Sequence, residues 1–125
     1  MHEMPFTQAL IELALDKAEG KKILKIHLRV GWLSSIVPES VQVFFDHLSR
    51  DTLAEGAALD FEFVPISLAC QACGRVLDLP YQPSRNPRQA LAQAFRDGCP
   101  CGAGKLSLAG GLGFDVAGVE IEDSV

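Results

Sequence analysis

The sequence is organised around two short cysteine motifs, Cys70-Gln71-Ala72-Cys73 and Cys99-Pro100-Cys101, which contain all four cysteines of the chain. Each motif can place two thiolates on one metal ion from a tight turn. Two such turns facing each other complete a tetrahedral shell of four sulfurs, the coordination that is typical of structural zinc. The spacing therefore predicts a zinc site whose ligands are Cys70, Cys73, Cys99 and Cys101.

The same cysteines could instead form two disulfides or stay unpaired in a core. Disulfide frameworks are typical of secreted proteins, whereas the cytoplasm keeps thiols reduced and free to bind a metal. The opening residues, Met1-His2-Glu3-Met4-Pro5, lack the basic region of a signal peptide. The sequence also has no run of about 18 apolar residues, so it predicts no membrane helix. We therefore expect a cytoplasmic protein with metal-binding thiols.

Composition limits the size of the fold and the class of partner. With 125 residues, of which 48% are hydrophobic, the chain can form one domain, or a small domain with a minidomain. The formal net charge of −5 disfavours nucleic-acid binding, which needs a basic surface for the phosphates. A zinc site with four thiolates has no open position for a water molecule, so we do not expect an enzyme.

Hydrophobic periodicity predicts the regular elements. Apolar residues recur at helical spacing after Pro5, with Leu10 and Leu13 on the expected buried stripe. Leu24 and Ile26 begin an alternating pattern in which His27 falls on the polar face, where we expect it to be solvated. The expected elements are helices over residues 5–19, 38–50 and 88–96, and strands over 21–30, 58–66, 106–108 and 114–121.

This order of elements predicts an α+β fold. We expect a small β-sheet with two helices packed on it, and an inserted minidomain that resembles a zinc ribbon. Residues 1–68 and 105–125 are assigned to the α+β domain, and residues 69–104 to the zinc-binding minidomain.

The first three residues, Met1-His2-Glu3, are a second candidate metal site. The α-amine, the two following backbone amides and the His2 imidazole can all reach one ion. Such planar nitrogen coordination favours Ni(II) or Cu(II) over Zn(II). Glu3 could add a carboxylate oxygen or a hydrogen bond to a ligand. The simpler alternative is a frayed polar terminus that binds no metal.

The two sites occur together in a known family. The stretches that carry the resemblance are Met1-His2-Glu3-Met4, Leu28-Arg29-Val30-Gly31-Trp32-Leu33-Ser34, Val37-Pro38-Glu39-Ser40, Ala54-Glu55-Gly56-Ala57-Ala58-Leu59, the two cysteine pairs and Gly118-Val119-Glu120-Ile121-Glu122. In order and over nearly the whole chain, they resemble the hydrogenase nickel-incorporation proteins of the HypA/HybF family. Two features depart from the family: its second cysteine pair is normally C-x-x-C, and its segment between the pairs is shorter.

The resemblance implies a metallochaperone that delivers Ni(II) to the precursor of a [NiFe]-hydrogenase large subunit. A nickel-handling maturation GTPase would be its partner, a homodimer is compatible with it, and some relatives also supply urease. The implied nickel ligands are the amine of Met1, the backbone of His2 and Glu3, and the His2 imidazole, with zinc held by the cysteines. The alternative function is a zinc-ribbon adaptor that docks a partner protein and carries no nickel.

Overall fold

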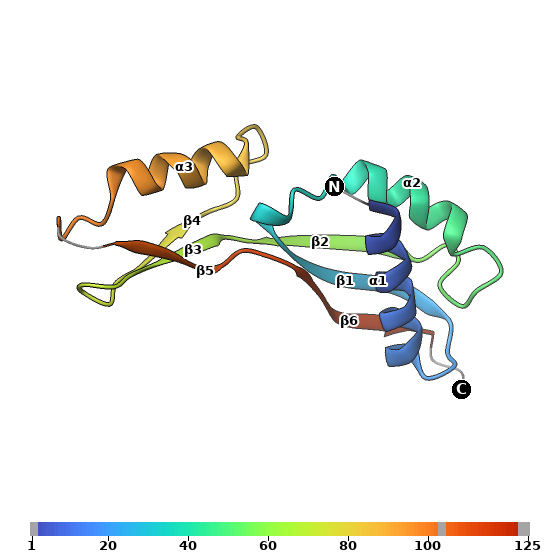
Figure 1. Cartoon of the computed structure of the whole chain (residues 1–125). Coiled ribbons are helices and arrows are strands. Elements are labelled where there is room, and N and C mark those ends of the chain that lie inside the picture. The colour runs from blue at the N-terminus through green and yellow to red at the C-terminus, as the bar shows by residue number, and fades with distance from the viewer. Residues whose placement is uncertain (1–2, 103–104, 123–125) are drawn as a thin grey trace. The chain divides into compact units, whose positions relative to one another are not determined.

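Three α-helices and two three-stranded sheets form the part of the chain that the structure describes, residues 3–102 and 105–122 (Figure 1). The structure is a computed structural model. Its elements divide into two units, which are Met1–Arg29, Ile36–Glu62 and Phe114–Val125 for unit 1, and Val30–Ser35 and Phe63–Gly113 for unit 2. Helices and largely separate small sheets confirm the predicted α+β class.

Unit 1 is built on a sheet with the strand order β2-β1-β6. Its central strand is β1 (Ile23–Gly31), flanked by β2 (Ala58–Val64) and β6 (Phe114–Ile121). Helix α1 (Glu3–Ala18) packs against β6 and against α2 (Pro38–Leu48). The fully buried apolar side chains of this unit come from both helices and from β1 and β6; they include Leu10, Ala14, Ile23, Ile26, Val41, Phe45 and Val116.

Two residues of unit 1 that we expected to be buried are exposed. Leu13 is 44% exposed and Ile11 is buried in its place, so the buried stripe of α1 lies further around the helix than predicted. Leu24 is 51% exposed, whereas Ile23 is fully buried. The alternation of β1 therefore changes phase at the start of the strand, and it follows the predicted pattern only from Ile26 onward.

Unit 2 contains an antiparallel sheet that the sequence only partly predicted. Its central strand β3 (Ile66–Cys70) pairs with β4 (Val76–Leu79) and with β5 (Leu106–Gly110). We expected a single strand over residues 58–66 and none at β4. Pro65 separates β2 from β3, because proline has no N–H to donate to a strand ladder, and β3 then joins a different sheet.

One apolar core holds unit 2 together. Trp32 and Ile66 pack with Leu68 of β3 and with Ala90 of helix α3 (Pro87–Asp97). Trp32 opens a short 3-10 helix, Trp32–Ser34. Trp32, Ile66 and Leu68 lie outside residues 69–104 but share this core with Ala90 of α3.

Two glycines let the end of β1 and the 3-10 helix approach another part of unit 2. The Gly31 N–H donates to the Gly113 carbonyl oxygen at 2.8 Å, and the Leu33 N–H donates to the Gly111 carbonyl oxygen at 2.9 Å. A Cβ at Gly31 would overlap the backbone of Gly111, and one at Gly111 would lie 2.7 Å from the Ile66 Cα. Only glycine fits at this approach.

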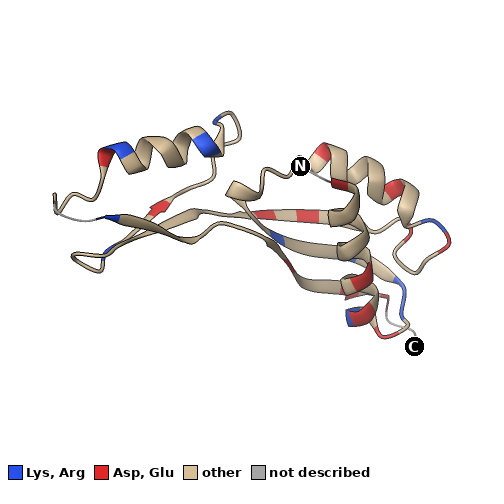
Figure 2. Ribbon diagram, viewed as in Figure 1, with Lys and Arg blue, Asp and Glu red and all other residues tan. Residues whose placement is uncertain are grey.

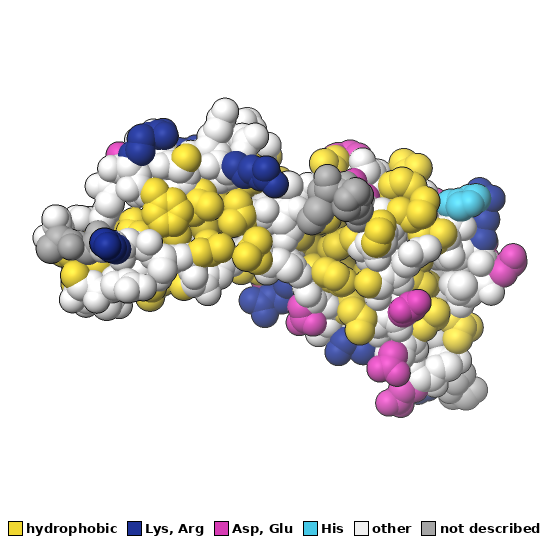
Figure 3. Space-filling view, in the orientation of Figure 1, with side chains coloured by type: hydrophobic (Ala, Val, Ile, Leu, Met, Phe, Trp, Pro, Cys, Tyr) yellow, Lys and Arg dark blue, Asp and Glu magenta, His cyan; other side chains and the backbone are white. Residues whose placement is uncertain are grey.

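Charge is distributed unevenly between the units (Figure 2). Unit 2 has five basic and two acidic side chains, a formal charge of +3 with neutral thiols. Because the whole chain carries −5, unit 1 carries −8. In the same orientation, hydrophobic side chains form a broad area on unit 2 with basic side chains at its borders (Figure 3).

Candidate metal centre

The four cysteine side chains converge within unit 2. Cys70 is the last residue of β3 and Cys73 lies in the turn that follows, while Cys99 and Cys101 follow the end of α3. All four sulfur atoms lie within 4.8 Å of one another. The shorter second pair, with one residue between its cysteines, therefore reaches the same cluster as the first.

The distances between sulfurs fit a shared metal ion and exclude disulfides. The Sγ atoms of Cys70 and Cys101 are 3.7 Å apart, and those of Cys73 and Cys99 are 3.6 Å apart. A disulfide bond is about 2.0 Å long, so all four residues are free cysteines. Around a tetrahedral zinc ion with Zn–S bonds of about 2.3 Å, neighbouring sulfurs are about 3.8 Å apart. The donor set and its spacing match that geometry.

Backbone hydrogen bonds shape the two turns that present the thiols. The Gly74 N–H donates to the Cys70 carbonyl oxygen at 3.0 Å, and the Gly102 N–H donates to the Cys99 carbonyl oxygen at 2.9 Å. Gly74 and Gly102 have φ angles of +75° and +80°, which side-chain-bearing residues rarely adopt. The glycine after each pair thus permits the turn that brings its two sulfurs together.

The clustered thiols have divergent acidities. Hydrogen bonds from the backbone amides of Cys73 and Ala72 lower the pKa of Cys70 to about 6, against the opposing effect of burial. The amide of Cys101 also lowers the pKa of Cys99, but burial and the three other thiols outweigh it and raise that pKa to about 12. With only the other thiols beside it and no cation, the Cys99 thiol therefore resists ionisation. A divalent cation would reverse this preference by stabilising the thiolates.

The structure addresses one residue of the second candidate site. Met1 and His2 lie outside the described residues. Glu3 is the first residue of α1, and its carbonyl oxygen accepts a hydrogen bond of 2.6 Å from the Thr7 hydroxyl. The first four amides of a helix have no carbonyl partner within that helix. The Glu3 amide belongs to this group, so no helical hydrogen bond would be lost if it bound a metal.

Comparison with known proteins assigns the chain to a family. A family model described as "Hydrogenase/urease nickel incorporation, metallochaperone, hypA" matches residues 1–121. The chain belongs to the HypA family. The HypA hydrogenase maturation factor of Geobacter metallireducens (strain ATCC 53774 / DSM 7210 / GS-15) is 33% identical over 123 residues, which cover 98% of this chain and 100% of that protein. The corresponding factor of Geobacter sp. (strain M21) is 37% identical over the same coverage.

HypA solution structures share the fold. The Ni metallochaperone HypA from Helicobacter pylori superposes with a TM-score of 0.64 at 20% sequence identity, covering 97% of each chain. A second HypA solution structure gives a TM-score of 0.66 at 19% identity, covering 98% of this chain and 97% of the other. The HypA family consists of maturation factors rather than known enzymes. No helix in the described part of the chain is long and apolar enough to cross a bilayer.

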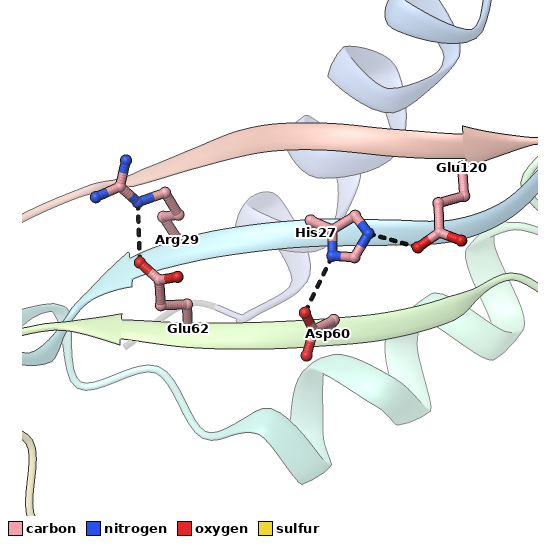
Figure 4. A network of polar contacts seen from close by, with 5 residues as sticks. All are labelled: His27, Arg29, Asp60, Glu62 and Glu120. Atoms are coloured by element: carbon pink, nitrogen blue, oxygen red, sulfur yellow. Dashed lines mark hydrogen bonds and ion pairs between the residues drawn. The ribbon is translucent and has the colours of Figure 1, made fainter.

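A polar cluster that the HypA resemblance did not indicate lies on the sheet of unit 1 (Figure 4). His27 of β1 contacts Asp60 of β2 through Nδ1, at 3.0 Å from Oδ2, and Glu120 of β6 through Nε2, at 2.7 Å from Oε2. Beside it, the Arg29 Nε donates to a carboxylate oxygen of Glu62 at 3.1 Å. His27 lies on the polar face of β1 as predicted and is 36% exposed; its contacts with carboxylates of both neighbouring strands were not predicted.

The geometry of His27 favours the protonated form of its ring. Both ring nitrogens face carboxylate oxygens, which only accept hydrogen bonds when ionised, and a neutral imidazole has a single N–H. Both contacts can form only with the imidazolium. Consistently, hydrogen bonding to Asp60, and then to Glu120, raises the pKa of His27 above 6.5. The protonated ring thus links both outer strands of the sheet to the central one.

Proposed function

We propose that this chain delivers Ni(II) to the precursor of a [NiFe]-hydrogenase large subunit, with a nickel-handling maturation GTPase as its partner. The observation that carries the proposal is the family match, which spans residues 1–121 and so includes both Met1-His2-Glu3 and the cysteines. The family description names hydrogenase and urease. The curated relatives are named as hydrogenase maturation factors, which supports hydrogenase as the recipient.

Nickel would be bound as cargo at the N-terminus. The proposed donors are the α-amine of Met1, the amide nitrogens of His2 and Glu3, and the His2 imidazole, which together can form a planar set of four nitrogens. The position of Glu3 at the first turn of α1 supports this set, because its amide has no partner within the helix. The Glu3 carboxylate would be a further oxygen donor or a hydrogen-bond partner of a ligand.

Zinc would be bound at Cys70, Cys73, Cys99 and Cys101 as a structural ion. The convergence of the four sulfurs and their spacing support this assignment. A zinc ion with four thiolate ligands is coordinatively saturated, so it would fix the turn after β3 to the segment after α3 without activating a water molecule. This division of labour, with nickel as cargo and zinc as scaffold, is the function that we propose.

The nickel site can be tested through the chain's first atom. A Gly-Ser extension before Met1 turns the α-amine into an ordinary amide and should abolish tight nickel binding as fully as His2→Ala does. No nearby group replaces the amine, because Met4 offers a thioether and Pro5 an amide without N–H. The measurement is a nickel titration of the zinc-loaded protein, following the absorption band of planar Ni(II).

The matched control is His47→Ala, which removes an exposed imidazole from α2 and should leave nickel binding unchanged. Zinc content and the far-UV circular dichroism spectrum should be the same in all variants. If the extended protein bound nickel as tightly as the native one, the amine would not be a ligand. If the native protein took up no nickel, the zinc-ribbon adaptor would become the better description.

A further inference from the structure

Unit 2 has a groove whose lining contains no proposed metal ligand, although Gly98 and Pro100, next to Cys99 and Cys101, line one end of it. It lies between α3 and the sheet, has a volume of about 260 Å³, and is floored by Leu68, Leu77 and Leu79, with Ala90 and Ala94 along the helix side. A water molecule occupies about 30 Å³ in the liquid, so the groove has room for an aliphatic side chain. The hydrophobic area on unit 2 in Figure 3 shows that this unit presents apolar side chains to solvent.

Two basic side chains lie where α3 begins, and one of them lines the groove. Arg85 lines it and Arg88 lies in the first turn of α3; both are exposed, and neither forms an ion pair within the described residues. The positive end of the helix dipole adds to this charge. At the other end of α3, Asp97 also lines the groove, but its carboxylate accepts a hydrogen bond of 2.9 Å from the Gln93 side chain.

We propose that this groove docks a segment of a partner protein in which an aliphatic side chain is flanked by carboxylates. The aliphatic side chain would fill the space above Leu77 and Leu79, and the carboxylates would face Arg85 and Arg88. The formal charge of unit 2, which is +3 with neutral thiols and +1 with a zinc ion on four thiolates, contrasts with the −8 of unit 1 and favours an acidic partner. This inference concerns partner recognition and does not depend on nickel binding.

Two other occupants fit the observations less well. An anionic membrane would also be attracted by the arginines, but membrane binding uses apolar side chains that protrude into the lipid, whereas Leu68, Leu77 and Leu79 floor a recess. A second copy of this chain could offer its acidic unit 1. That contact would be heterologous, joining unit 1 of one copy to unit 2 of the next, and would lead to open-ended assembly unless it closed into a ring.

The test is selection from a phage library of random 12-residue peptides on the zinc-loaded full chain at low salt. Enriched peptides should combine Leu, Ile or Met with Asp or Glu. A synthetic copy should shift the amide resonances of Leu77, Leu79 and Ala94 in nuclear magnetic resonance spectra. It should bind about tenfold more weakly to the double variant Arg85→Glu, Arg88→Glu, because two charges that attract the carboxylates of the peptide would then repel them.

The matched control is Arg50→Glu, which reverses an exposed charge in unit 1 and should retain full affinity. Enrichment of peptides without acidic residues, no enrichment, or equal affinity for the double variant would each overturn the proposal. So would shifts confined to residues outside the groove. The proposal would also fail if the groove resonances shifted on addition of phosphatidylglycerol vesicles but not of peptide, or if the chain oligomerised through Arg85.

Discussion

The ionisation of His27 links the stability of unit 1 to pH. Hydrogen bonds to Asp60 and Glu120 raise its pKa in the folded state above the ordinary value of 6.5. The stabilisation is therefore fully present below about pH 6.5 and is lost as the pH rises through the folded-state pKa. The stability of the native protein should fall over this range. His27→Gln should remove that fall, because an amide side chain does not titrate there.

The measurement pairs nuclear magnetic resonance titration of the His27 ring with urea unfolding at several pH values. Asp60→Asn is the informative partner variant, since it removes the largest cause of the raised pKa and should bring the titration of His27 back toward its ordinary value. A native His27 that titrated at or below 6.5 would contradict the bridged imidazolium.

Gly31 is a second residue whose identity is set by a single contact. In Gly31→Ala the new methyl group would overlap the backbone of Gly111, and the hydrogen bonds between these two segments would be displaced. Overpacking of this kind costs about 1–3 kcal/mol in the free energy of unfolding. We expect a loss in this range, measured as a lower urea midpoint of the zinc-loaded protein.

Gly118→Ala provides the control for Gly31→Ala. Nothing lies within 4 Å of the added Cβ, and the backbone of Gly118 is not in the left-handed region. Its stability should stay within about 0.5 kcal/mol of the native value. Equal stability of the two variants would show that the close approach of Gly31 to Gly111 carries no constraint.

At the scale of elements, the sequence predicts what local periodicity determines. The three helices were expected from apolar spacing, and the structure has them within about two residues. The break at Pro65 was missed because Val64, Pro65 and Ile66 are all apolar, so no polar residue marks the end of β2. Strand β4 was missed because four residues next to a turn carry too little periodicity.

The candidate sites also differ in whether a local sequence pattern or the fold brings their residues together. Cysteine spacing is local, so the convergence of four sulfurs could be predicted without a fold. The contacts of His27 could not, because Asp60 and Glu120 are 33 and 93 residues away and meet it only through the strand order β2-β1-β6. Alternation predicts which face a side chain occupies, but not which strands are neighbours or in what register they pair.

Helix α3 depends on its cap. The Asn86 side chain accepts hydrogen bonds from the backbone amides of Arg88 at 2.8 Å and Gln89 at 3.3 Å. Asn86→Ala should destabilise unit 2 by about 1 kcal/mol and speed hydrogen exchange of these two amides. Asn86→Asp should restore both properties, whereas Ser84→Ala in the same loop should change neither. Unchanged exchange in Asn86→Ala would mean that the cap does not hold the first turn.

At the scale of the whole molecule, each unit has apolar residues of its own to bury. Unit 1 buries side chains from α1, α2, β1 and β6, and unit 2 packs Trp32, Ile66, Leu68 and Ala90 together. The cysteines belong to unit 2 alone. Loss of a metal from the thiols should therefore disturb unit 2 and leave unit 1 folded, because no side chain of the cysteine cluster is part of the unit 1 core.

Cys73→Ala tests this separation. The variant should lose zinc, since three thiolates leave the tetrahedral shell open, and the amides of β3, β4 and β5 should exchange with solvent faster than in the native protein. The amides of α1 and β1 should keep their protection, and most of the far-UV helix signal should survive. Gln71→Ala, an exposed change in the same turn, should retain zinc and native exchange throughout. If Cys73→Ala also lost protection in α1 and β1, folding of unit 1 would depend on the thiol cluster, and the two units would be a single cooperative structure held by the metal.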